Sequence, residues 1–209
     1  MKQKLIYLVR HGDIGLGSEK RYIGQTDLPL SSLGLKQASL LKDMFSHLSF
    51  DNIFCSDLKR AQQTAEIIAI LSTAVPILCP EFREVNMGDW EGKTFSEIKT
   101  RFPKKFTERG QTIANFVPPR GESFSDCSKR VLPAFERLAE SAGNTILIVA
   151  HAGVNRIIIC HVLGMPLENV FQLHQSYGCV NLLSQDSSGY RLNYMNNLVV
   201  KETGEGLIY

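Results

Sequence analysis

The feature that most constrains this chain is an apolar run that stops abruptly at polar residues. Leu5 to Val9 are all apolar or aromatic, and Arg10, His11 and Gly12 follow directly. A short run of this kind is typical of a strand that is buried on both faces, as in the centre of an α/β sheet. In such sheets, ligands bind at the carboxyl edge of the strands. Arg10 and His11 therefore fit a ligand site, and taken alone they fit an ordinary polar strand exit equally well.

Length and composition predict one globular domain. The chain has 209 residues, of which 44% are hydrophobic and 21% are charged, so it can bury a substantial core. We expect residues 1–209 to form a single domain. The segment 94–121 is rich in Lys, Arg and Phe and lacks a clean periodicity, so we interpret it as a partly helical excursion, or lid, over one edge of the sheet.

Charge and cysteine content exclude several classes of protein. A net charge of +2 is too small for general binding to nucleic acid or membranes, and no apolar run is long enough for a signal peptide or a membrane span. Five widely spaced cysteines without a Cys-x-x-Cys pair argue against a disulfide framework and against a zinc site. We expect a cytoplasmic protein with small, buried cysteines, no metal and no cofactor; a homodimer is left open.

Hydrophobic periodicity predicts alternating strands and helices. Helices are expected after capping residues at Ser31 or Ser32 and at Ser56–Asp57, over 123–142, and from Ala152 to Val162. Strands are expected over 52–55, 75–79 and 145–150, and late in the chain near 179–185 and 190–196. On the first helix, the residues at helical spacing are Leu33, Gln37, Leu40, Leu41, Met44 and Leu48. This order of elements favours an α/β fold.

Three of the predicted strands end beside histidine or arginine. The first ends at Arg10 and His11, the second is followed by Arg60, and another ends at His151. Guanidinium groups and the free N–H groups of a helix start bind tetrahedral dianions, so phosphate is the natural ligand for such an edge. An unperturbed imidazole is partly neutral at cytosolic pH and can then act as a nucleophile on phosphorus.

Several short sequence blocks, spread over most of the chain, carry a further signal. They are Leu8 to Gly12, Arg21 to Ser31, Ser56 to Ala65, Phe82-Arg83-Glu84 with Gly88 to Gly92, Gly121-Glu122-Ser123, and Val149 to Arg156. In these blocks and their order, the chain resembles the histidine phosphatase (phosphoglycerate mutase-like) superfamily. The resemblance implies a three-layer α/β/α sandwich around a mostly parallel sheet, and a metal-independent phosphomonoester hydrolase whose only required partner is a small phosphorylated substrate.

The resemblance also implies roles for particular residues. His11 would be phosphorylated transiently, and Arg10, Arg60 and a protonated or donating His151 would bind the phosphoryl group. The general acid, and later base, would be Glu84. The acidic residues of this region do not distinguish themselves by sequence: Glu81, Glu84, Asp89, Glu91 and Glu122 each fit a solvated loop acid equally well.

The predicted substrate contacts also include Arg21, Gly24, Glu84 and Ala152. The chain departs from the family pattern at Ile14 and Gly17, where many members carry polar residues, which removes an expected phosphate contact from that loop. Arg21 and backbone amides are expected to compensate.

The choice of substrate stays open at this stage. The chain is shorter than the mutases of the family, which favours a phosphatase, and the motifs are most similar to those of α-ribazole phosphatases of cobalamin synthesis. The alternatives are a broad-specificity sugar phosphatase, a fructose-2,6-bisphosphatase-like enzyme, a phosphoglycerate mutase, a non-catalytic phosphate-binding protein and a metallohydrolase, although no compact metal-ligand spacing is present.

Other polar or aromatic residues have simpler interpretations. We expect a packing or capping role for His161, a surface position for His47, a structural role or a reach into the pocket for His174, and a core position for Trp90. Lys104, Lys105 and Arg109 fit either a solvated face or a lid over an anionic substrate.

Overall fold

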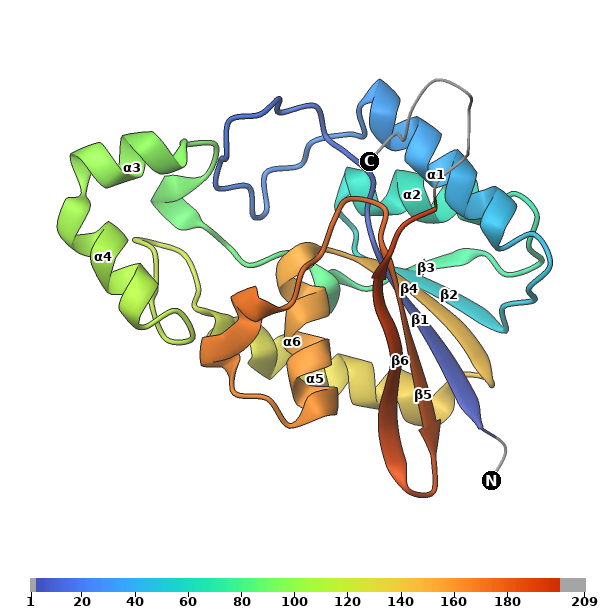
Figure 1. The fold of residues 1–209 in the computed structure, drawn as a ribbon. Coiled ribbons are helices and arrows are strands. Elements are labelled where there is room, and N and C mark those ends of the chain that lie inside the picture. Colours follow the sequence, from blue (N-terminus) through green and yellow to red (C-terminus); the bar gives the residue numbers. More distant parts are fainter. Residues whose placement is uncertain (1–2, 200–209) are drawn as a thin grey trace.

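The computed structural model describes residues 3–199 and places a six-stranded sheet between layers of helices (Figure 1). The strands are β1 (Lys4–Arg10), β2 (Asn52–Cys55), β3 (Pro76–Leu78), β4 (Thr145–Ala150), β5 (Val180–Asp186) and β6 (Gly189–Asn197), in the spatial order β3-β2-β4-β1-β5-β6. The strands β3, β2, β4 and β1 run parallel, whereas β5 and β6 are antiparallel additions. The mostly parallel α/β sheet expected from the sequence is confirmed.

Alternate residues of the central strands supply two cores on opposite faces of the sheet. The helices that pack on these two faces are α1 (Ser32–Met44), α2 (Lys59–Ala69), α5 (Phe124–Ser141) and α6 (Ala152–Leu163). Ile6 and Leu8 of β1 pack in the core that contains α5 and α6, and Tyr7 and Val9 pack in the core that contains α1 and α2. Since successive strand residues point to opposite faces, a run that is apolar at every position is buried on both. The three-layer sandwich is confirmed, and the run Leu5 to Val9 is its centre.

Serine caps begin two of these helices, as the sequence predicts. The hydroxyl of Ser31 accepts a hydrogen bond from the N–H of Gly34 at 3.1 Å. Ser123 and Asp126 form a reciprocal capping box at the start of α5. Each cap satisfies N–H groups that have no partner within the helix.

One local prediction, the cap of α2, is wrong, and the buried face of α1 includes residues that the hydrophobic pattern does not mark. The helix α2 begins later than the expected Ser56–Asp57 cap: Leu58 precedes it without a side-chain cap, and Ser56 accepts the N–H of Leu58 at 3.3 Å while Asp57 pairs with Arg83. On α1, Leu33 is exposed, and the buried residues are Gly34, Ala38 and Leu41. The small residues Gly34 and Ala38 therefore share the inward face of α1 with Leu41.

The segment 94–121 is partly helical and projects to one side of the sheet (Figure 1). It contains α3 (Phe95–Arg101) and α4 (Pro103–Gln111), and its apolar residues join Tyr22 and Trp90 in a third, smaller core. Trp90 is thus a core residue, as expected. The short 3₁₀ turns η1 (Pro80–Phe82), η2 (Gly88–Trp90) and η3 (Leu167–Gln172) complete the chain.

Two further features of the structure are the state of the cysteines and the apolar character of the helices. All five cysteines are buried free thiols. Within residues 3–199, no helix is both long enough and apolar enough to cross a membrane.

Candidate active site

The carboxyl ends of β1, β2 and β4 meet at one point, because these strands are parallel neighbours. The N–H of His11 donates to the carbonyl of Ala150 at 3.0 Å, which extends the β1–β4 ladder by one residue. His11 and His151 therefore leave adjacent strands side by side, with their ring centroids 5.0 Å apart. Ser56, which follows β2, lies 2.8 Å from Nε2 of His151 through its Oγ. The sheet itself thus brings together what the sequence separates by up to 140 residues.

His11 is held as a neutral imidazole with a free electron pair on Nε2. Its Nδ1 lies 2.7 Å from the carbonyl of Gly12, so Nδ1 carries the proton and donates it. Nε2 then accepts a hydrogen bond from Nε of Arg60 at 3.2 Å. Burial, followed by the positive charges of Arg60 and Arg10, holds the pKa of His11 well below its usual value. The ring is therefore in the form that can act as a nucleophile at neutral pH.

Arg60, in the first turn of α2, is fully buried and held on three sides. Besides its contact with His11, it donates from one terminal nitrogen to the carbonyl of Thr26 at 2.7 Å and from the other to the carbonyl of Gly24 at 2.6 Å. Two neutral carbonyls orient the guanidinium without neutralising it. Its charge therefore stays available to an anion beside His11.

Arg10 is the second cation at this edge. One terminal nitrogen donates to the carbonyl of Gln175 at 2.6 Å, and the guanidinium carbon lies 3.7 Å from the ring centroid of Tyr177. Tyr177 also lies against His11, with 5.5 Å between ring centroids. The Nε of Arg10 is buried and has no hydrogen-bond partner among the described residues. A buried donor without a partner is costly in free energy, so this atom points to a ligand that accepts a hydrogen bond.

His151 is neutral in this structure as well. Burial, followed by the positive charge of Arg60, holds the pKa of His151 well below its usual value. Of the two forms expected for His151, the structure therefore favours the neutral ring, whose Nε2 lies against Ser56. Its Nδ1 is buried and, within residues 3–199, has no hydrogen-bond partner.

Glu84 presents its carboxylate at the start of α6. One oxygen accepts the N–H of Gly153 at 3.0 Å, and the other accepts the N–H of Val85 at 3.0 Å. A Cβ at position 153 would lie 2.4 Å from an oxygen of Glu84, so glycine is required for this close approach. These two contacts hold the carboxyl group next to His151, the residue before α6.

The other four acidic residues of this region are engaged elsewhere. Glu81 pairs with Arg137, Asp89 with Arg120, and Glu122 with Arg130. The carboxylate of Glu91 accepts backbone N–H groups of Gly24, Gln25, Thr26 and Met87 and so shapes that loop. Structure therefore separates Glu84 from its neighbours, which the residue types alone did not.

Two further predicted residues belong to the same neighbourhood. Gly24 contributes through its carbonyl contact with Arg60, and Ala152 is the first residue of α6. Ile14 is half-buried, and Gly17 is exposed with a φ of 69°.

Arg21 is placed differently from its prediction. Its guanidinium donates to Glu19 at 2.8 Å and to the carbonyl of Gly92 at 3.0 Å, and its backbone pairs with Thr94. It therefore serves the base of the segment 94–121 rather than the histidine pocket.

Sequence reasoning missed several residues of the site. Ser56 was interpreted only as a helix cap, and Gln175 and Tyr177 were not identified as partners of Arg10. A position directly after β2 was a signal for Ser56, since it shares the edge with the other strand ends. His174 is exposed and lines a cavity of about 590 Å³ together with Arg10 and Tyr177.

The remaining histidines lie outside the cluster, and the site carries no evident metal ligand set. His161 pairs with Glu136 at 2.6 Å, and His47 is exposed, as expected. Among residues 3–199, no group of three or more His, Cys, Asp or Glu side chains is arranged to hold a metal ion.

Comparison with known proteins identifies the family. The family model described as “Histidine phosphatase superfamily (branch 1)” matches residues 6–198. The “Adenosylcobalamin/alpha-ribazole phosphatase” of Escherichia coli (strain K12) is 28% identical over 197 residues, which cover 93% of this chain and 97% of the relative. The “Probable phosphoglycerate mutase GpmB” of Yersinia pestis (strain Pestoides F) is 32% identical over 165 residues, which cover 77% of this chain and 75% of the relative.

Solved structures give the same result. The crystal structure of the alpha-ribazole phosphatase from Shigella flexneri matches with a TM-score of 0.84 and 29% identity, and the match covers 92% of this chain and 96% of that one. The fold therefore agrees with that of the Shigella flexneri phosphatase, and the chain has nearly the length of the Escherichia coli relative.

Proposed function

Because the chain belongs to the histidine phosphatase superfamily (branch 1), and is therefore a phosphatase of phosphorylated small molecules, we propose that it hydrolyses phosphomonoesters through a phosphohistidine at His11. The observation that carries the proposal is the neutral His11 ring, whose unprotonated Nε2 faces the Nε of Arg60 at 3.2 Å. That arrangement supplies a nucleophile and a charge for the phosphoryl oxygens at the same point.

The first half-reaction transfers the phosphoryl group to the protein. The electron pair of Nε2 of His11 forms the N–P bond while the ester P–O bond breaks. Charge on the phosphoryl oxygens is stabilised by Arg60, by the unpartnered Nε of Arg10 and by neutral His151. Arg60 exchanges its contact with Nε2 for a phosphoryl oxygen, so its donor is in position before the substrate arrives.

In both half-reactions, Glu84 moves the proton. It first gives a proton to the departing alkoxide, and its carboxylate then takes a proton from the water that attacks phosphorus. The N–P bond breaks, phosphate leaves, and Nε2 recovers its electron pair. The contact with the N–H of Gly153 supports this role, because it holds the carboxyl group beside His151.

For the substrate, we propose α-ribazole 5′-phosphate. The support is the similarity to α-ribazole phosphatases over nearly the full length of both proteins. This ester has an alkyl leaving group, which requires the proton that Glu84 would supply. The Yersinia relative favours phosphoglycerate as the second candidate. Five buried free thiols also support an enzyme that works in the reducing cytoplasm.

A substrate screen tests the proposal. We expect kcat/KM to be highest for α-ribazole 5′-phosphate among that ester, phosphosugars, fructose 2,6-bisphosphate and 3-phosphoglycerate, with His11→Ala as the blank and with or without a chelator. Equal turnover with chelator supports metal-independent hydrolysis; loss that added metal restores would contradict it. A higher kcat/KM for another ester would contradict the proposed substrate but not the phosphatase activity. Conversion of 3-phosphoglycerate to its 2-isomer without net hydrolysis would identify a mutase.

A further inference from the structure

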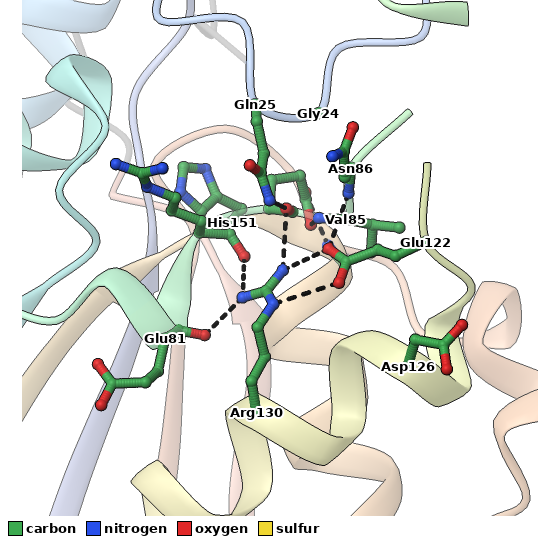
Figure 2. Close-up of polar contacts among 12 residues, drawn as sticks. Gly24, Gln25, Glu81, Val85, Asn86, Glu122, Asp126, Arg130 and His151 are labelled. Atoms are coloured by element: carbon green, nitrogen blue, oxygen red, sulfur yellow. Dashed lines mark hydrogen bonds and ion pairs between the residues drawn. The ribbon is translucent and has the colours of Figure 1, made fainter. Parts of the chain in front are cut away.

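Arg130, in the second turn of α5, makes five hydrogen bonds, and three of them go to the segment that carries the proposed proton donor. Figure 2 shows it at the centre of these contacts. One terminal nitrogen donates to the carbonyls of Glu81 at 2.5 Å and Arg83 at 2.7 Å. The other donates to the carbonyl of Glu84 at 3.1 Å. Three carbonyls within four residues are therefore gathered by one side chain.

Glu122 holds Arg130 in this orientation. Its two carboxylate oxygens accept hydrogen bonds from Arg130 at 2.6 Å and 3.3 Å, which is a two-point contact that fixes the plane of the guanidinium. One of these oxygens also accepts the N–H of Asn86 at 2.9 Å. Arg130 thus binds carbonyls at and before Glu84, and Glu122 binds an N–H after it, so the pair holds the segment 81–86 on both sides of Glu84.

The peptide of Glu84 is also connected to the other half of the pocket. Its carbonyl accepts a second hydrogen bond, from the side chain of Gln25 at 3.1 Å. The carbonyl of the neighbouring residue Gly24 accepts a hydrogen bond from Arg60. The side chain of Gln25 therefore connects the backbone of Glu84 to the loop whose carbonyls orient Arg60.

We infer that Arg130, paired with Glu122, is a positioning residue that sets the location of the Glu84 carboxyl group in the phosphoryl pocket. The segment 81–86 has only the 3₁₀ turn η1 as regular structure, so Arg130 replaces the hydrogen bonding that a helix or strand would supply. Proton transfer requires a donor within hydrogen-bond reach of the leaving oxygen. The inference rests on the proposed role of Glu84, and Arg130 itself is assigned no contact with the substrate.

The test compares two arginines of the same helix. Arg130→Met removes the contact with the Glu84 carbonyl, whereas Arg137→Met removes a partner of the Glu81 side chain at 3.2 Å. For Arg130→Met we expect kcat on an alkyl phosphate to fall by up to about 100-fold, because displacing a catalytic group by about 1 Å costs that much. The loss on p-nitrophenyl phosphate, whose leaving group needs little protonation, should be smaller. Arg137→Met should leave the ratio of the two kcat values unchanged.

A second variant and a double variant separate positioning from a loss of folding. Arg130→Lys keeps the charge but not the two-point contact, so it should give an intermediate shift in the kcat ratio with a folded circular dichroism spectrum. In a Glu84→Gln background, Arg130→Met should cause no further change in that ratio. Equal losses on both esters, or a full additional shift in the double variant, would overturn the positioning role. If Glu84→Gln alone leaves the ratio unchanged, the proposed proton donor is wrong, and that result is distinct from a failure of the Arg130 arms.

Discussion

The pocket at the strand ends and the excursion 94–121 differ sharply in the burial and hydrogen bonding of their polar side chains. His11, Arg60 and His151 are each at most 4% exposed, and every one of them has a hydrogen bond to a carbonyl or to a neighbouring side chain. In α4, by contrast, no residue is buried, and Lys104 and Lys105 lie in solvent. The groups that would carry the reaction are fixed by the sheet, whereas the excursion has surface that can vary freely.

One residue of the excursion departs from this pattern. Arg109 lies over three aromatic rings, with its guanidinium carbon 5.3 Å from the ring centroid of Tyr22, 5.9 Å from that of Phe95 and 5.4 Å from that of Phe171. Such contacts hold α4 against the rest of the molecule. The comparison therefore predicts large kinetic effects for the pocket and small ones for the exposed lysines of α4.

Among the groups that assist His11, the largest of these effects is expected for Glu84→Gln with a poor leaving group. General acid catalysis contributes about 10²–10⁴-fold, so kcat on an alkyl phosphate should fall by that order while p-nitrophenyl phosphate suffers less. Rapid-mixing measurement of phosphoenzyme formation separates the transfer step. Glu81→Gln is the control and should show no dependence on the leaving group. Equal losses on both esters would mean that the carboxylate orients the site and donates no proton.

Arg60→Ala should lower kcat by about 10²–10³-fold, the usual cost of losing one preorganised donor to transition-state charge. The steady-state readout is a parallel fall in kcat and kcat/KM, and His151→Ala should behave in the same way. An increase in KM at constant kcat would show instead that these side chains bind only the ground state.

Stability should depend on pH through the two buried histidines. Unfolded histidine takes up a proton below about pH 6.5, but folded His11 and His151 have lowered pKa values and stay neutral, so the free energy of unfolding falls as pH falls. Each histidine adds a slope of up to about 1.4 kcal/mol per pH unit. Denaturant titrations between about pH 7 and pH 5 should therefore give a smaller slope for His11→Ala. An unchanged slope would contradict the neutral form of His11.

The smallest effect is expected for the exposed face of the excursion. Replacing Lys104 and Lys105 together by alanine should leave kcat unchanged, because neither side chain is placed among the reacting groups, and any effect on an anionic substrate should be confined to KM. Steady-state kinetics on the preferred ester decide this. A fall in kcat would show that the excursion takes part in the reaction. It would contradict the view that only the pocket at the strand ends carries the reacting groups.

Features of the fold and the site could be predicted from the sequence where the interactions that produce them lie within a few residues of each other. The run Leu5 to Val9 and the caps Ser31 and Ser123 were found because pattern and cap chemistry act over a few residues. The strand ends could be grouped because parallel topology places them at one edge. Glu84 needed the family resemblance, since its distinction is a contact with Gly153, 69 residues away.

Arg130 and Arg21 show the limit more clearly. Arg130 occupies an ordinary position on an amphipathic helix, and its partners are carbonyls that every sequence has, so no residue pattern marks it. Arg21 was expected to compensate for Ile14 and Gly17, but its partner Glu19 lies two residues away and holds it at the surface. Composition and spacing predict neither the contacts of Arg130 with distant backbone carbonyls nor the pairing of Arg21 with Glu19.

The most direct test of the account is the site of phosphorylation. The protein is mixed with substrate, quenched in alkali within milliseconds, and the phosphopeptide is located by mass spectrometry under conditions that preserve phosphohistidine. The account predicts one phosphoryl group per chain on His11, lost rapidly in acid and absent from His11→Ala. A phosphoryl group on His151 or on any other residue, or full turnover by His11→Ala, would contradict it.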